Sequence, residues 1–148
     1  MEMWRTVQRL RGLLRSESDC AAICQKTLDG ITAPAWKGLV GSLARDHAQQ
    51  IVDLRTILEQ LGAASDSPNA PILREALSAL GGDMSDKTRL GMCLQWEEHA
   101  AHAYEQALAE HHPRTVQALL HGHRAVAADH VAALQAVLST EQPVIRTA

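Results

Sequence analysis

The chain has 148 residues, 46% of them hydrophobic and 21% charged, and its formal net charge is −3 with the eight histidines neutral. This length and composition indicate one globular domain with a buried core and exclude a disordered chain. The negative charge argues against nucleic-acid binding, and no apolar run reaches the roughly 18 to 20 residues that cross a bilayer, which argues against a membrane protein.

Four long stretches carry the 3.6-residue apolar period of amphipathic helices. Gly30 is a typical residue to end the first helix, and Thr32 with Pro34 forms a typical start for the second. Pro113 separates the third helix from the fourth. The four predicted helices cover residues 2–29, 34–61, 85–112 and 114–139.

The connector between the second and third helices spans residues 63–84 and includes a short helical segment, residues 71–80. Ten helical and about twelve extended residues reach about 55 Å, whereas the third helix is about 42 Å long. The connector can therefore cross the full height of a bundle, and one such crossover is typical of ferritin-like four-helix bundles. We expect this all-α fold over residues 1–140 as a single domain, followed by a flexible tail at 141–148.

Each predicted helix places one carboxylate or imidazole on its apolar face. Counted from the two tight turns, the carboxylate and the imidazole of each hairpin stand opposite each other near mid-height, so all four fall in one layer. Tyr104 and His123 form a second polar layer one to two turns nearer Pro113, where they would line the site. The four residues of the central layer are Glu17, His47, Glu97 and His130.

These four side chains predict a metal site. A charged carboxylate is costly to bury unless it is paired or coordinated, and two Glu with two His suit a first-row transition metal such as iron, manganese or zinc. The alternative is a core without metal, in which Glu17–His47 and Glu97–His130 are hydrogen-bonded pairs that fix how the helices associate. The pattern itself is compatible with both.

The sequence resembles the ferritin-like superfamily over about residues 4–138, and in particular its small, largely uncharacterised four-helix-bundle proteins related to the rubrerythrins. The segment from Glu97 to Tyr104 is similar to the Glu-x6-Tyr helix of that group, and Glu17-x6-Cys24 occupies the same frame in the first helix. Residues 44–47 and 127–130, Ala-Arg-Asp-His and Ala-Ala-Asp-His, also match each other. The resemblance implies this internal duplication.

The same two segments depart from the family pattern. Di-iron members carry Glu-x-x-His on these helices, whereas this chain has Ala44 and Ala127 at the two Glu positions. A dinuclear centre would lack two carboxylates, so the remaining residues are expected to hold one metal ion or none. Asp46 and Asp129, each one residue before a histidine, are expected to orient the imidazoles from a second layer of contacts or to carry interface charge.

The three cysteines, an odd number, fit reduced thiols better than a disulfide framework. Cys20 and Cys24 lie one turn apart, which suits ordinary core residues better than a redox pair. Residues 1–18 lack the apolar stretch of a secretory signal, so we expect a cytoplasmic protein. Exposed helix faces, with Trp36 or Trp96 as anchors, favour a homo-oligomer.

Two functions are therefore compatible with the sequence. The first is a metal-binding ferritin-like bundle, and the second is a degenerate bundle without metal that acts as a structural or stress-related interaction module. Neither pattern assigns a catalytic residue or a small-molecule substrate, so the sequence leaves open whether the protein is an enzyme.

Overall fold

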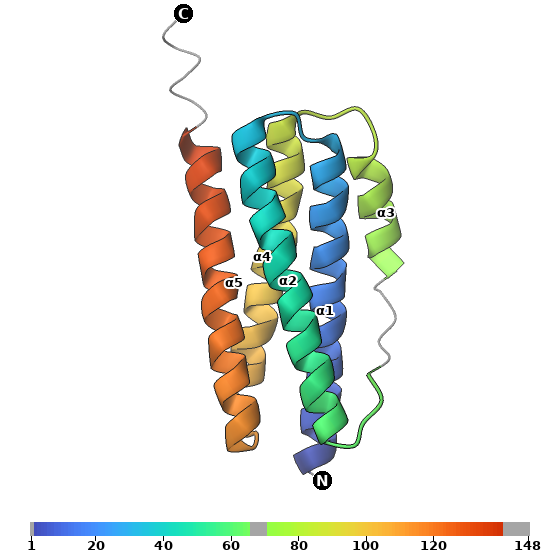
Figure 1. The fold of residues 1–148 in the computed structure, drawn as a ribbon, viewed down its shortest axis with the longest axis vertical. Coiled ribbons are helices and arrows are strands. Elements are labelled where there is room, and N and C mark those ends of the chain that lie inside the picture. Colours follow the sequence, from blue (N-terminus) through green and yellow to red (C-terminus); the bar gives the residue numbers. More distant parts are fainter. Residues whose placement is uncertain (1, 66–70, 141–148) are drawn as a thin grey trace, which may run out of the picture.

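Five α-helices make up the described part of the chain, residues 2–65 and 71–140, in a computed structural model (Figure 1). Four long helices lie side by side, and the short α3 lies outside them along α1. The predicted all-α bundle and its short crossover helix are confirmed, while the predicted tail at 141–148 lies outside the described residues. The helices are α1 (Glu2–Gly30), α2 (Pro34–Gln60), α3 (Pro71–Leu80), α4 (Asp86–Leu108) and α5 (Arg114–Thr140).

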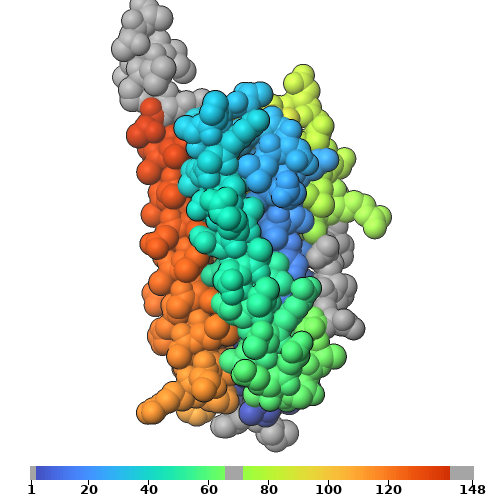
Figure 2. All heavy atoms as spheres, viewed as in Figure 1, coloured from blue at the N-terminus to red at the C-terminus, as the bar shows by residue number. Residues whose placement is uncertain are grey.

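Helix α2 ends at one end of the bundle and α4 begins at the other, so these two helices run in the same direction (Figure 1). Helix α1 packs against both α2 and α4, and α5 packs mainly against α4. Figure 2 shows α2 on one face of the molecule, with α1 on one side of it and α5 on the other. Every neighbouring pair of long helices is therefore antiparallel, as expected for a bundle with one full-height crossover.

Helix α4 ends at Leu108, four residues before the expected end at His112. A residue before proline avoids helical dihedrals, so His112 turns away from the helix ahead of Pro113. Its Nε2 donates to the Ala107 carbonyl at 2.9 Å, and its Nδ1 accepts the Thr6 hydroxyl at 2.8 Å. The buried imidazole thus closes the end of α4 and joins it to the start of α1.

The start of α2 also differs from the prediction. Ala33, not Thr32, is the residue that precedes the helix, and it makes no side-chain cap. The carboxylate of Asp86, in the first turn of α4, instead binds the turn that leads into α2. It accepts the backbone N–H of Thr32 at 3.2 Å, that of Ala33 at 3.1 Å and the Thr32 hydroxyl at 2.9 Å.

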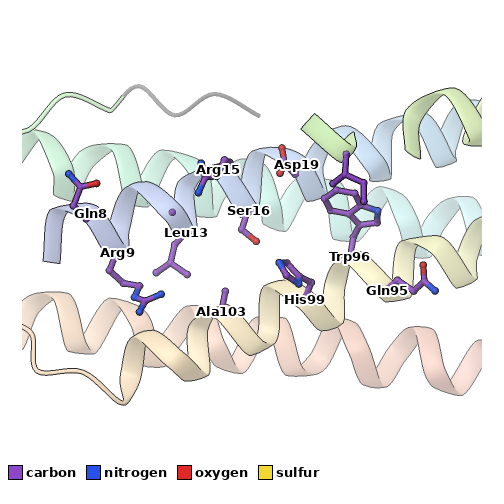
Figure 3. Close-up of a pocket in the computed structure, with 12 residues that line it drawn as sticks. Gln8, Arg9, Leu13, Arg15, Ser16, Asp19, Gln95, Trp96, His99 and Ala103 are labelled. Carbon is purple, nitrogen blue, oxygen red and sulfur yellow. The ribbon is translucent and has the colours of Figure 1, made fainter. Parts of the chain in front are cut away.

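A cavity of about 730 Å³ lies at the outer side of the seam between α1 and α4 (Figure 3). Leu13 and Ser16 line it from α1, Trp96 and His99 from α4, and Ile72 from α3.

The described helices contain no stretch of 18 residues that is apolar enough to cross a membrane.

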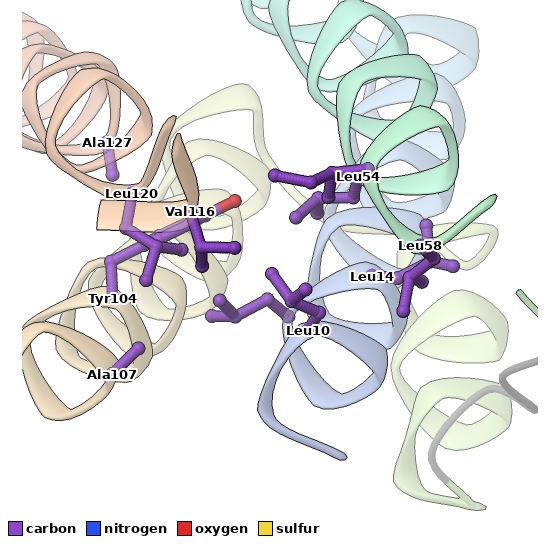
Figure 4. Packing of buried hydrophobic residues seen from close by; sticks show 11 residues of the cluster. Leu10, Leu14, Leu54, Leu58, Tyr104, Ala107, Val116, Leu120 and Ala127 are labelled. Carbon is purple, nitrogen blue, oxygen red and sulfur yellow. The ribbon is translucent and has the colours of Figure 1, made fainter. Parts of the chain in front are cut away.

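The core consists of two apolar clusters, one in each half of the bundle. The first lies toward the α4–α5 turn and includes Leu10, Leu54 and Leu120 (Figure 4). The second lies toward the α1–α2 turn and is extended by Leu73 and Leu80 of α3. Between the two clusters, all four long helices bury polar side chains.

We expect Asp86→Ala to lower the free energy of unfolding by about 1 to 2 kcal/mol, because it removes the acceptor for two backbone N–H groups at a helix start. Urea denaturation measures the change. Asp83→Ala, in the exposed loop before α4, is the matched control and should change the stability by less than about 0.5 kcal/mol. Equal effects of the two substitutions would contradict the role of Asp86 in holding the turn before α2.

Candidate metal centre in the bundle core

A buried polar layer separates the two apolar clusters at mid-height. The side chains of this layer are 0 to 5% exposed, which leaves little access to water. The helical period of 3.6 residues brings each side chain to the inner face of its helix, on the stripe that carries leucines above and below it. The members are Glu17 of α1, His47 and Gln50 of α2, Glu97 and Tyr104 of α4, and His123 and His130 of α5.

His47 lies at the centre of this layer, between the two carboxylates. Its Nδ1 is 2.5 Å from Glu17 Oε1, and its Nε2 is 2.5 Å from Glu97 Oε2. Each nitrogen can donate to its carboxylate only when the ring is protonated on both sides. The geometry therefore fits an imidazolium held between two carboxylates that come from α1 and α4.

Glu97 also connects the centre to α5. Its second oxygen, Oε1, is 2.9 Å from Nδ1 of His130, and Nε2 of His130 is 2.8 Å from Asp46 Oδ2. Asp46 is 48% exposed, so this branch of the network reaches the surface between α2 and α5. Asp46 thereby orients the His130 ring, as a carboxylate beyond the ligands often does for a metal-binding histidine.

Glu17 connects the centre to the opposite half. The Tyr104 hydroxyl donates to Glu17 Oε2 at 2.5 Å, and the Gln50 amide, with its nitrogen toward Glu17, donates to both oxygens at 2.9 and 3.0 Å. Tyr104 is in turn 3.1 Å from His123 Nδ1, and His123 Nε2 is 3.1 Å from Asp53.

These contacts form one continuous hydrogen-bonded chain through the core. Both of its ends are aspartates of α2 that reach solvent, about two helical turns apart. Its members in order are Asp46, His130, Glu97, His47, Glu17, Tyr104, His123 and Asp53.

The charges in the layer stabilise one another against burial. Burial alone would lower the pKa of His47, but the hydrogen bonds and charges of Glu17 and Glu97 outweigh it and raise the pKa to about 10. Burial alone would raise the pKa of Glu97, but hydrogen bonds from His130 and His47 lower it to about 2. The pKa of His130 is raised, since hydrogen bonds to Glu97 and Asp46 outweigh its burial.

Three buried cysteines lie beside the same layer. Cys24 Sγ is 3.8 Å from Glu97 Oε2 and 3.8 Å from Cys93 Sγ, while Cys20 Sγ donates to the Trp96 carbonyl at 3.5 Å. Burial and the charge of Glu97 hold the pKa of Cys20 well above its usual range. The hydrogen bond with Cys93, together with burial, raises the pKa of Cys24 well above its usual range.

Sequence reasoning missed these thiols as potential ligands. The signal was available in part, because Cys93 lies four residues before Glu97 and therefore on the same helix face. Among the described residues, two groups have potential ligand atoms that all lie within 4.8 Å of one another. They are Cys20, His47 and Glu97, and Cys24, Cys93 and Glu97.

The four residues that were expected to bind metal form a line of contacts. Glu17 contacts His47, His47 contacts Glu97, and Glu97 contacts His130. The two nitrogens of an imidazole point in opposite directions, so a single ion can take only one nitrogen of His47. Of the residues expected to support the site, Asp46, Tyr104 and His123 belong to the hydrogen-bonded chain. Asp129 does not, because the position before His130 is rotated by about 100° around the helix and its side chain is exposed.

The two alanines at the positions where the sequence resemblance implied carboxylates pack in apolar surroundings. Ala127 belongs to the first apolar cluster, and Ala44 packs against the second. Two irons held by carboxylate ligands would need oxygen donors at these positions, and methyl groups cannot supply them. The residues present therefore do not fit a dinuclear iron centre, whereas two carboxylates and two imidazoles fit the donor preference of one transition-metal ion.

Solved structures with a similar fold exist. One is described as ferritin-like, diiron-carboxylate proteins from Bacillus anthracis str. Ames; it has a TM-score of 0.78 and 14% identity, over 93% of this chain and 98% of that chain. A conserved hypothetical protein from Mycobacterium tuberculosis has a TM-score of 0.77 and 13% identity, over 95% and 94% of the two chains. No protein-family model and no curated protein matches the sequence. At these identities the comparison concerns the fold, and the chain has the ferritin-like bundle fold that the sequence predicted.

The pKa shifts predict how the stability of the metal-free protein depends on pH. The lowered pKa of Glu97 stabilises the fold above about pH 4.5, and this contribution is lost as the pH falls toward about 2. The raised pKa of His47 stabilises it fully below about pH 6.5, and this contribution is lost as the pH rises toward about 10. With a chelator present, the free energy of unfolding in urea should therefore be highest between about pH 4.5 and 6.5.

His111→Gln is the control for this profile, because it removes an exposed histidine near the α4–α5 turn and should leave the profile unchanged. A free energy of unfolding that increases between about pH 6.5 and 10 would show that the His47 pKa is not raised.

Tyr104→Phe removes the hydroxyl that donates to Glu17. We expect a decrease in the free energy of unfolding of about 1 to 3 kcal/mol, because a buried carboxylate loses a donor that water cannot replace there. Asp53→Asn, at the partly exposed end of the chain, should cost less, since solvent reaches that position. Chemical denaturation of both variants tests this, and the reverse order would contradict it.

Proposed function

We propose that the core of this ferritin-like bundle binds one divalent transition-metal ion in the layer of Glu17, His47, Glu97 and His130. The ion would take one nitrogen of His47, and the other nitrogen would keep its hydrogen bond to a carboxylate. The observation that carries the proposal is the convergence of one such side chain from each long helix into a single buried layer, linked by contacts of 2.5 to 2.9 Å. Iron, manganese and zinc all accept this combination of carboxylate oxygen and imidazole nitrogen.

Charge balance supports the proposal. A histidine that binds metal is neutral, so binding releases the proton that it carried. Without metal, both nitrogens of each ring face carboxylates, which favours two imidazolium rings beside Glu17 and Glu97. Exchange of their two protons for one divalent ion leaves the total charge of the layer unchanged, so the buried layer acquires no uncompensated charge.

The hydrogen bonds around His47 also suit a ligand. Whichever nitrogen binds the ion, the other keeps its hydrogen bond to a carboxylate, which fixes the orientation of the ring. The hydrogen bond to Asp46 fixes the orientation of the His130 ring in the same way. Bound there, the ion would supply Lewis-acid or redox chemistry, with the Tyr104 hydroxyl beside it as a hydrogen-bond donor to Glu17.

A second function is favoured by a different observation. Glu17 already accepts hydrogen bonds from His47, Tyr104 and Gln50, and Glu97 accepts from His47, His130 and Cys24. A layer satisfied in this way needs no ion, so the protein would be a metal-free structural or stress-related module.

In either function we propose a cytoplasmic homo-oligomer, which the exposed apolar side chains support. Trp4, Val52 and Ile72 are more than half exposed. Trp36 and Trp96 are only partly buried and pack against the second apolar cluster. They therefore retain surface that a second copy of the chain could cover.

Elemental analysis of untagged protein distinguishes the two functions. The proposed site accounts for about one iron, manganese or zinc ion per chain, and Glu97→Gln or His130→Gln should remove most of that ion because each deletes a charged or basic ligand. Glu98→Gln and His121→Gln are matched controls on exposed faces of the same helices and should retain the metal. A wild-type protein that holds no metal after exposure to all three ions, with variants that are only less stable, would support the metal-free module instead.

A further inference from the structure

We propose that Cys24, Cys93 and Glu97 form a second metal site, which takes a thiophilic divalent ion such as zinc. This site goes beyond the function proposed above, because it lies on the α1–α4 side of Glu97 and uses sulfur ligands. Its three side chains are at most 1% exposed, and their potential ligand atoms all lie within 4.8 Å of one another.

The separations between these atoms match the coordination geometry of zinc. Two sulfurs held at about 2.3 Å from one zinc ion with tetrahedral angles are about 3.8 Å apart, and a sulfur and an oxygen ligand are about 3.6 Å apart. The Cys24 and Cys93 sulfurs are 3.8 Å apart, and Cys24 Sγ is 3.8 Å from Glu97 Oε2. An ion would therefore require only small movements of these side chains.

Cys20 belongs to the neighbouring group of potential ligand atoms, with His47 and Glu97. It lies one helical turn before Cys24 on the same face of α1, and its sulfur lies within 4.8 Å of Glu97 and His47 ligand atoms. Structural zinc sites are almost always four-coordinate, with cysteine as a common ligand. The two groups of potential ligands share Glu97, which makes this carboxylate the point where they meet.

The chemistry of the donors selects the class of ion. Thiolates prefer zinc and other soft or borderline ions, whereas magnesium and calcium prefer oxygen ligands. A divalent ion also balances the negative charge that two thiolates would add next to Glu97. The layer that contains Glu17 and His130 offers no sulfur, so the two sites differ in the ions that they favour.

A disulfide between Cys24 and Cys93 is the competing use of these thiols. It would bring together the two sulfurs alone and would give no role to the carboxylate beside Cys24. A disulfide would also remove the thiol hydrogen that Cys24 donates to Glu97. An ion bound to both sulfurs would bind Glu97 in place of that hydrogen, so it keeps all three side chains partnered.

The cavity at the α1–α4 seam lies on the same side of the bundle as this site. Two of its lining residues, Asp19 and Trp96, directly precede Cys20 and Glu97 in the sequence. The Cys20 thiol donates to the Trp96 carbonyl, so it contacts a residue of the cavity wall.

Cobalt absorption tests the proposal on the full chain. Reduced, metal-free protein is titrated with Co²⁺, and we expect a sulfur-to-cobalt charge-transfer band in the near ultraviolet that saturates at one equivalent and disappears when zinc is added. Cys24→Ser and Cys93→Ser should each weaken cobalt binding more than about tenfold. Cys93→Ala is a second variant if the serine disturbs the apolar surroundings, because buried cysteine packs as a small hydrophobic residue.

The melting temperature without metal shows whether each variant folds, and the rise in melting temperature with zinc gives a second measure of binding. Absence of the band in the wild type, its persistence in folded cysteine variants, or a Cys24–Cys93 disulfide found by mass spectrometry in protein purified under reducing conditions would each overturn the proposal.

Glu17→Gln separates this site from the one proposed above. The variant should keep the cobalt–sulfur band while it loses the metal bound by the Glu and His side chains. A band that survives when neither Glu17→Gln nor His130→Gln changes the metal content would refute the earlier site and leave this one standing. The reverse result, metal content that depends on Glu17 without any sulfur band, would refute only the thiolate site.

Discussion

Two carboxylates buried at the centre of an apolar bundle impose the main constraint on this structure. Glu17 and Glu97 are each 1% exposed, and an ionised carboxylate at such a position is strongly destabilising unless donors surround it. The bundle meets this requirement with His47, which hydrogen-bonds both of them, and with one further ring or hydroxyl on each side. The imidazole of His47 lies between the carboxylates of α1 and α4, although α2 itself packs mainly against α1.

The same constraint explains how α5 joins the rest. Helix α5 contacts α4 closely and α2 only slightly, yet two imidazoles of α5 reach carboxylates of α2. His130 to Asp46 and His123 to Asp53 are therefore polar bridges across the seam with the least packing. Such bridges specify how the hairpins are oriented more than they stabilise them, because partly exposed ion pairs contribute little net free energy.

The fold is the ferritin-like bundle, and its core carries a mixed set of donor atoms. Ala44 and Ala127 present methyl groups to the apolar clusters, while three thiols each lie near Glu97. Oxygen, nitrogen and sulfur atoms therefore meet in one buried region, and such a set suits a borderline ion better than a hard one. The helices set the depth of each side chain, and the side chain at that depth sets the chemistry.

The sequence by itself determined the helices, the crossover and the depth of each polar side chain, because a 3.6-residue period and a fixed rise per residue depend on local structure alone. It therefore identified Glu17, His47, Glu97 and His130 as one layer, and it paired the members within each hairpin. Only the tertiary structure decided the contacts between hairpins. The second bond of His47 goes to Glu97, Cys24 meets Cys93 across the α1–α4 seam, and Asp129 faces solvent. Spacing along one helix cannot supply these facts, since they depend on how far each helix is rotated about its axis and on which neighbour it docks against.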